Sequence, residues 1–188
     1  MKLEYPLFWR NASSKRKRIY SIIFIFIIAS ILTVIGAYIP VSSQDAQTIS
    51  NQLNSTLNTH KANGTLTEYI FLNNFEICLI MFIPIIGPVL GFIILFDTGT
   101  ALGAIASVQG YPVALGLISL VLTPVFWLEF TAYSTAIAES IWLFRRITQF
   151  RWRMIKRELK NCGILIGICA AILIVGAIVE VWLISIGV

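Results

Sequence analysis

The chain has 188 residues, of which 57% are hydrophobic and only 12% are charged, and its mean hydropathy is +0.84. This composition excludes an ordinary soluble domain and predicts a single domain of helices that cross a lipid bilayer, because only helices and closed barrels satisfy the backbone there. The formal net charge is +5, and the basic residues are unevenly distributed along the chain.

The first predicted span covers residues 19–39, a run without charge that follows the basic stretch SKRKR. A cleaved signal peptide is the alternative, but its apolar core would extend over only about 7–15 residues. We therefore expect an uncleaved span, and a transmembrane domain over residues 19–188 that follows a basic N-terminus, residues 1–18.

The distribution of lysine and arginine predicts the orientation in the membrane. Six basic residues precede the first span, seven lie between Arg145 and Lys160, and only Lys61 lies elsewhere. Short basic segments stay in the cytoplasm. We therefore place the N-terminus and residues 145–161 inside the cell.

Residues 40–68 are polar and nearly uncharged, and we interpret them as a solvated connector on the outside. They contain two glycosylation sequons, which begin at Asn54 and Asn63. Sequons act only on an outward-facing surface, so both asparagines are candidate glycosylation sites.

Residues 69–144 must cross the membrane an odd number of times, and their length suits three crossings. The predicted elements are span two over 75–95, a cytoplasmic turn at 97–99, span three over 100–122 with an interruption at 109–112, and span four over 124–144. In the alternative, residues 99–121 form a re-entrant hairpin of two half-helices. A last span over 162–187 completes an all-α, polytopic bundle of about five spans in the cell membrane, with the C-terminus outside.

Proline and small residues predict how these spans bend and pack. The stretch PIIGPVLG in span two contains Pro84 and Pro88, which predict a broken helix. Small residues recur four positions apart and predict close helix packing, with a permeation path as the alternative. They are Gly87 and Gly91, Gly99 and Gly103, and Ala132 and Ala136.

The segment RRITQFRWRMIKRELK, residues 145–160, has its apolar and basic residues on opposite sides of a helix. It predicts an amphipathic helix that lies on the anionic inner leaflet, with partner docking as an alternative. Without a recognition fold, nucleic acid is not an expected partner.

The three cysteines and one histidine form no metal-ligand or triad pattern. Cys162 and Cys169 share a helix face, but no CxxC spacing accompanies them. We therefore expect no cofactor, no metal and no enzyme chemistry.

Four glutamates, Glu76, Glu129, Glu139 and Glu180, lie in or near the spans, and no basic residue lies in a span to pair with them. Ionised carboxylates are costly in lipid, so we expect these groups to face the bundle interior, with Glu129 and Glu139 as neutral donors. Candidate partners of Glu129 are Thr123, Asn73, Asn74 and a carbonyl freed by the prolines. A buried hydrogen bond that locks helices and a proton or cation relay both remain open.

Four motifs in the centre of the chain are similar to one family. They are FLNNFE at 71–76, GPVLGF at 87–92, TGTALG at 98–103 and PVFWLEFTAYSTAIAES at 124–140. In this order and spacing they resemble the stage II sporulation protein M family of integral membrane proteins, and residues 71–144 form the family-like core. Asn73 and Asn74 match its asparagine pair, Gly99 and Gly103 its turn glycines, and Pro124, Glu129 and Ala132 its last motif. Thr98 replaces the family's asparagine, and Val125 and Phe126 replace a His-Gly pair.

The resemblance implies a non-enzymatic membrane scaffold, which in spore formers is associated with a peptidoglycan-degrading complex. The first hypothesis is therefore a scaffold or accessory subunit that contacts the bilayer and other membrane proteins or a second copy. The second is a channel or transporter-like component, with a polar path lined by Asn73, Asn74, Glu129 and Glu139. An auxiliary subunit of a larger respiratory or secretory complex is a third.

Overall fold

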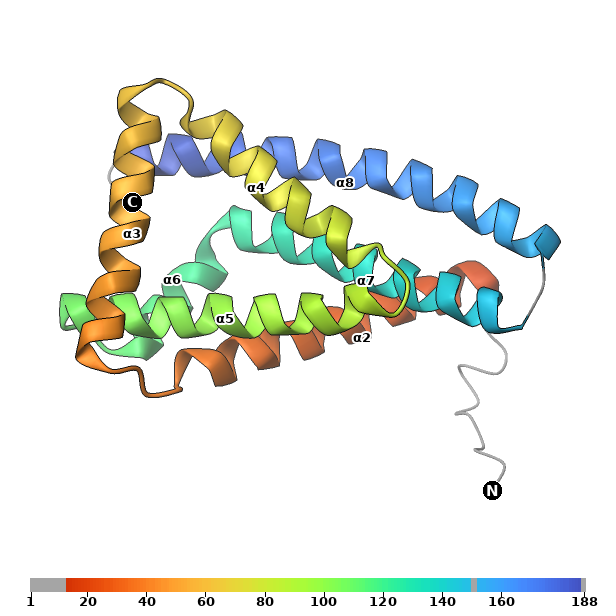
Figure 1. Ribbon diagram of the computed structural model, residues 1–188, viewed down its shortest axis with the longest axis horizontal. Coiled ribbons are helices and arrows are strands. Elements are labelled where there is room, and N and C mark those ends of the chain that lie inside the picture. The colour runs from red at the N-terminus through yellow and green to blue at the C-terminus, as the bar shows by residue number, and fades with distance from the viewer. Residues whose placement is uncertain (1–12, 150–151, 187–188) are drawn as a thin grey trace.

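The computed structural model describes residues 13–149 and 152–186, and within them every element of regular structure is a helix (Figure 1). The helices are α2 (Ser14–Ala37), α3 (Ser43–Ala62), α4 (Leu66–Met81), α5 (Ile86–Gln109), α6 (Val113–Leu122), α7 (Pro124–Thr148) and α8 (Trp152–Ile186). The all-α class predicted from the sequence is therefore confirmed.

The helices α2, α5, α7 and α8 run along the long axis of the molecule, and the shorter α4 is inclined to them (Figure 1). α3 lies across the end that is opposite the start of α2. The central element is α7, which contacts α2, α4, α5 and α8. Its residues Phe130, Ala132 and Ile137 belong to the main hydrophobic core, together with Met81 and Leu95.

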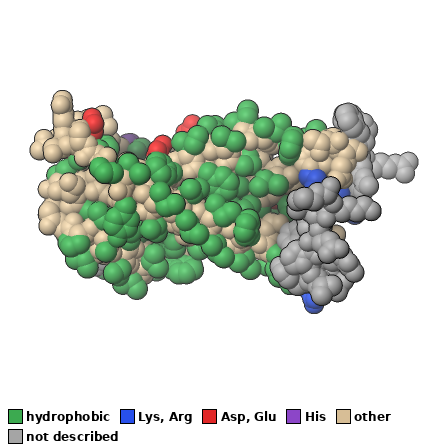
Figure 2. Space-filling model, turned by 90° about the horizontal axis from the view of Figure 1, so that it is seen from below, with side chains coloured by type: hydrophobic (Ala, Val, Ile, Leu, Met, Phe, Trp, Pro, Cys, Tyr) green, Lys and Arg blue, Asp and Glu red, His purple; other side chains and the backbone are tan. Residues whose placement is uncertain are grey.

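Within the described residues, three helices are long and apolar enough to cross a membrane: α2, α5 and residues 155–186 of α8. α6 and α7 form a pair bent by 80°, which gives a fourth span if the pair is counted as one. The surface is correspondingly apolar, and Figure 2 shows hydrophobic side chains over one face, with lysine and arginine at one end. The count of five spans stays a prediction, since α4 has only 16 residues.

The predicted outside connector, residues 40–68, is mostly helical, although no helix was predicted there. Ser42 caps α3 by accepting a hydrogen bond from the backbone N–H of Asp45 at 3.1 Å. Asp45 in the first turn and Lys61 in the last also suit the helix dipole. The turn into α4 passes through Gly64, whose φ of 68° is in the left-handed region.

The break predicted within residues 75–95 is present, but the two parts belong to separate helices and not to one span. α4 ends at Met81 and α5 begins at Ile86, and the chain reverses between them (Figure 1). Ile85 has a φ of 72°, a conformation that stops a right-handed helix. The hydroxyl of Ser140 on α7 donates to the carbonyl of Ile83 at 2.7 Å, so the turn is held by a neighbouring helix.

The predicted cytoplasmic turn at 97–99 lies in the middle of α5, and span three is not one helix. The real turn is at Gly110, whose φ of 74° ends α5. The interruption predicted at 109–112 is therefore confirmed. The re-entrant alternative differs from the structure in its first half, because residues 99–109 continue a helix of 24 residues.

The basic segment 145–161 does not form a separate interfacial helix. Residues 145–148 end α7, and residues 152–161 begin α8. The backbone N–H of Gln149 turns back to the carbonyl of Ile147, which closes α7 and explains the division. The basic residues thus extend two membrane helices at one end of the bundle.

Candidate functional site

An amide and a carboxyl join α4 to α7 in the interior of the bundle. Asn74 donates from Nδ2 to Oε1 of Glu129 at 2.5 Å. This hydrogen bond was one of the alternatives considered from the sequence. The side chain of Tyr133 and the carboxyl of Glu180 on α8 lie close enough to Glu129 to interact with it electrostatically.

The start of α7 fixes the position of Glu129. The Thr123 side chain caps the helix by accepting from the backbone N–H of Phe126 at 3.5 Å, and Pro124 occupies the first turn. Proline is favoured there because its ring suits the first turn and its missing N–H has no partner to lose. The helix then places Ala132 and Ala136, both fully buried, on the packed side.

The other two polar residues predicted for α4 do not join this contact. Asn73 and Glu76 are exposed on the outside of the helix, and Asn73 reaches only the side chain of Asn74, at 3.5 Å. The structure therefore brings together Asn74 and Glu129, with Asn73 hydrogen-bonded to Asn74 alone, and places Glu76 and Glu139 away from this contact.

Glu139 belongs to a second cluster, at the end of the bundle where lysine and arginine side chains gather (Figure 2). Arg18 on α2 forms ion pairs with Glu139 on α7 and with Glu158 on α8. Arg146 reaches the same Glu158, with 3.3 Å between Nε and Oε1. Glu139 and Glu158 are 5% and 3% exposed, so both are buried with their counter-charges. We call these four residues the ion cluster.

This cluster corrects the expectation that Glu139 is a neutral donor without a basic partner. Arg18 lies within α2, one residue before the predicted start of the first span. Glu139 is therefore a member of an interhelical ion pair with Arg18.

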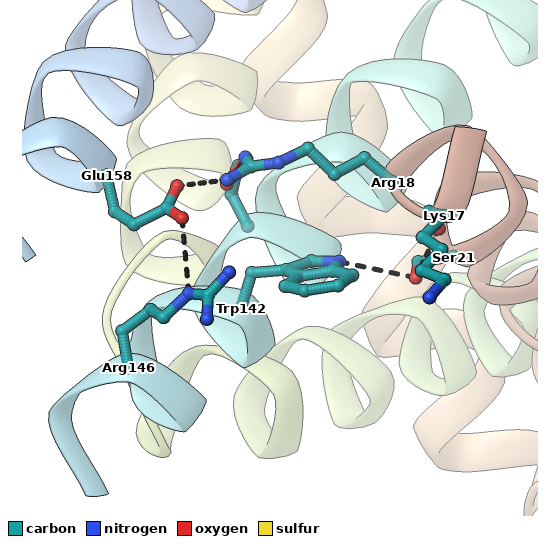
Figure 3. Close-up of polar contacts among 7 residues, drawn as sticks. Lys17, Arg18, Ser21, Trp142, Arg146 and Glu158 are labelled. Atoms are coloured by element: carbon teal, nitrogen blue, oxygen red, sulfur yellow. Dashed lines mark hydrogen bonds and ion pairs between the residues drawn. The ribbon is translucent and has the colours of Figure 1, made fainter. Parts of the chain in front are cut away.

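Trp142 forms a flat surface beneath the ion cluster. The guanidinium carbons of Arg18, Arg145 and Arg146 lie 5.6, 5.7 and 5.8 Å from its ring centroid. Its indole N–H donates to Oγ of Ser21 at 3.3 Å (Figure 3). Such cation–π contacts stabilise positive charge over the ring face, so the tryptophan helps to assemble α2 and α7 at this end.

The predicted packing glycines Gly99 and Gly103 lie where α5 meets α2. A Cβ added to either would overlap backbone atoms of α2, at Thr33 and Ala37. Thr33 also donates from Oγ1 to the carbonyl of Leu95 at 2.9 Å. The two backbones touch here, which leaves no space for a permeation path between α2 and α5.

The remaining predicted packing residues have different neighbours. A Cβ on Gly87 would overlap the carbonyl of Met81 in the preceding turn, and one on Gly91 would approach the side chain of Ile137 at 2.8 Å. The candidate glycosylation residues Asn54 and Asn63 are exposed on α3 and at its end.

Two buried thiols meet at one carbonyl near the centre of the bundle. Cys78 on α4 and Cys169 on α8 lie 3.9 and 3.6 Å from the carbonyl oxygen of Ala132. Among the described residues, no group of three histidine, cysteine or acidic side chains is placed to hold a metal ion.

A cavity of about 770 Å³ lies between α5, α6 and α8. Its walls are mainly aliphatic, and Glu180 contributes a carboxyl from α8. No residue of α6 is buried, although the helix is almost wholly apolar, so one of its sides faces this cavity and another faces outward.

Four functional residues escaped prediction from the sequence: Arg18, Trp142, Arg146 and Glu158. Sequence signals could have found two of them, Arg18 and Glu158. Arg18 directly precedes an uncharged span, and Glu158 is the only acidic residue between Arg145 and Lys160. Because both segments were placed on the same side of the membrane, an ion pair between them was open to prediction.

The apolar helices and their interhelical polar contacts define a multi-pass, helical integral membrane protein. A family model described as Stage II sporulation protein M matches residues 21–183, which is most of the chain. The chain therefore belongs to the stage II sporulation protein M family, as the central motifs indicated. None of the curated proteins and none of the solved structures gives a significant match.

Proposed function

We propose that this protein is a non-enzymatic membrane scaffold or accessory subunit that acts through helix contacts in a membrane complex. The proposal rests on one observation: the protein's carboxyl groups bind side chains of neighbouring helices. Glu129, Glu139 and Glu158 each bind a side chain from another helix. Groups engaged in this way hold helices in fixed positions, which is what a scaffold requires. Family membership supports the same role.

The arrangement of the polar residues gives the channel hypothesis no support. A polar path would need Asn73, Asn74, Glu129 and Glu139 to follow one another through the bundle. Instead Asn73 is exposed outside α4, and Glu139 belongs to the ion cluster. The close contact between α2 and α5 favours a rigid bundle.

Two measurements on the purified full-length chain test the proposal. After gentle solubilisation, we expect a partner protein to co-purify in fixed stoichiometry, identified by mass spectrometry. In proteoliposomes, we expect the wild type and Glu129→Gln to be equally impermeable to protons and small ions. A leak present in the wild type and lost in Glu129→Gln would contradict the scaffold and support the channel.

We further propose five passes through the cell membrane, with the N-terminus in the cytoplasm and the C-terminus outside. The ion cluster and the basic ends of α7 and α8 would then face the anionic inner leaflet. α3, with both sequons, would lie on the outside.

Thiol labelling in intact cells tests this orientation. In a chain with its three cysteines replaced by alanine, we expect a membrane-impermeant maleimide to label Asn63→Cys. The matched variant Lys15→Cys, also exposed, should be labelled only after the membrane is opened. The reverse pattern would invert the proposed topology.

A further inference from the structure

One face of α4 points away from the bundle and carries two polar and two apolar side chains. Leu72, Asn73, Glu76 and Leu79 are all exposed on this helix. The carboxyl of Glu76 has no hydrogen bond or ion pair with any residue that the structure describes. We call these four residues the outer face of α4.

The contacts of α4 show how deep this face lies. Ile70 packs against Ala177 of α8, and Cys78 reaches the carbonyl that Cys169 of α8 also reaches. Glu76 is therefore level with the middle of residues 162–179, a stretch of α8 without any charge. A carboxyl exposed at this depth would face acyl chains, where a charged group is costly and is normally covered by protein or water.

The outer face is also hollowed. A hollow of about 410 Å³ lies along it, with Glu68, Asn73 and Glu76 in its lining. His60 and Tyr69 also line it, and their rings stack with 4.1 Å between centroids. His60 also shares a hydrogen bond of 2.9 Å with Thr65. A hollow of this size accepts one or two side chains of another helix.

We propose that the outer face of α4 binds a transmembrane helix of another protein, and that this helix carries a lysine or arginine which pairs with Glu76 near the middle of the bilayer. The inference rests on the proposed scaffold function and specifies the surface and the chemistry of the partner. The carboxyl supplies the charge, the amide of Asn73 supplies a hydrogen-bonding group, and Leu72 and Leu79 supply apolar contact.

A second copy of the chain does not fit this face. Between residues 19 and 144 the only basic residue is Lys61, and residues 161–188 contain none. A second copy therefore has no cation to offer at the depth of Glu76, and two like faces would oppose their carboxylates. Apart from Lys61, the lysines and arginines that the structure describes lie at the far end of the bundle, where Arg18 and Arg146 already pair with acids.

Photocrosslinking in native membranes tests the proposal. A benzophenone side chain replaces Leu72 or Leu79 in the full-length chain, and Ile93 on α5 is the matched exposed control. From both α4 positions we expect one adduct with the same protein, cross-linked within a membrane helix that contains lysine or arginine. The control position should give no such adduct.

Substitutions then test the charge pair. Glu76→Gln should lower the yield of the adduct about tenfold or more, because the partner's cation would be left without a counter-charge. Asp97→Asn makes the same change at an exposed carboxyl of α5 and should leave the yield within about twofold. Glu76→Lys combined with a lysine-to-glutamate change in the partner should restore the adduct.

Four results would overturn the inference: no adduct from α4, an adduct of two copies of this chain, a cross-linked segment without a basic residue, or an unchanged yield with Glu76→Gln. An unaltered thermal transition of each variant shows that the bundle is intact. If a partner co-purifies in fixed stoichiometry but α4 gives no adduct, the scaffold function stands and this surface is rejected. If no partner co-purifies and α4 gives no adduct, both proposals fail.

Discussion

The ion cluster at one end of the bundle and the Asn74–Glu129 contact between α4 and α7 both hold carboxyl groups between helices, but with different partners. Glu139 and Glu158 are buried between helices, whereas Glu129 is half-buried between α4 and α7. At the end of the bundle, Arg18 and Arg146 supply full positive charges to Glu139 and Glu158. In the interior, Glu129 receives only an amide hydrogen bond.

This difference in partner follows from how deep each contact lies in the membrane. Long basic side chains are tolerated near the ends of helices, because their charged groups can reach water or lipid headgroups. Arg18 retains 22% of its side-chain exposure, which fits such a position. An amide needs no contact with water once its hydrogen bonds are made, so it suits the interior. The comparison predicts that the two contacts differ in strength and in their response to salt.

The largest expected effect comes from removing the shared cation. Arg18→Met leaves Glu139 buried without its counter-charge, and we expect the free energy of unfolding in mixed micelles to fall by about 3–5 kcal/mol. Arg16→Met, a neighbouring change at an exposed residue, is the control and should have little effect. The double variant Arg18→Met with Glu139→Gln should recover part of the loss. A loss below about 1 kcal/mol for Arg18→Met would show that the ion cluster does not stabilise the bundle.

A smaller effect is expected in the interior. Glu129→Leu leaves the amide of Asn74 without its acceptor, and we expect a loss of about 1–2 kcal/mol, measured by the same unfolding titration. Glu129→Gln keeps an acceptor oxygen of the same shape and should lose less. If the leucine and glutamine variants unfold alike, the hydrogen bond contributes nothing measurable.

A third substitution distinguishes the contribution of the Trp142 ring to stability from that of the ion pairs above it. Trp142→Phe keeps a ring but removes the indole N–H that binds Ser21 and weakens the cation–π contacts. We expect a loss of about 0.5–1 kcal/mol in thermal or chemical unfolding. Trp127→Phe is the matched control, since it also removes one indole hydrogen bond, to the carbonyl of Val121, but has no arginine against its ring among the described residues. Equal losses in both variants would argue against any contribution from the arginines.

The smallest expected effect is the change with salt concentration in how much each substitution destabilises the bundle. Between 0.1 M and 1 M sodium chloride the screening length falls from about 10 Å to about 3 Å. The destabilisation caused by Arg18→Met should shrink by a few tenths of a kcal/mol, because the ion cluster is partly open to solvent. The destabilisation caused by Glu129→Leu should not change. Equal salt responses would remove the distinction between the two contacts.

Long uncharged runs made part of the fold predictable. Residues 19–39 and 162–187 could be assigned as spans because no other structure accommodates so many apolar residues in succession. α3 was missed because its sequence is polar, although Ser42 and Asp45 supplied the signal for a helix start. The stretch PIIGPVLG predicted an interruption, but whether a helix bends or reverses there depends on Ile85 and on the distant Ser140.

The contacts between polar residues were predictable only in part. Asn74 was among the partners considered for Glu129, because it directly precedes predicted span two and Glu129 lies in predicted span four. Arg18 and Glu139 are 121 positions apart, and their pairing requires the correct order of helices in space. The mistaken turn at 97–99 and the assignment of residues 145–161 to a separate surface helix concealed that order.

The turn at Gly64 is a suitable place for an inserted epitope. It lies at the end of the bundle away from the ion cluster, and a Cβ placed on this glycine would meet no atom within 4 Å. A short epitope there should leave the helices undisturbed, and under the proposed topology antibodies could bind it at the cell surface while the basic end of the bundle remains free.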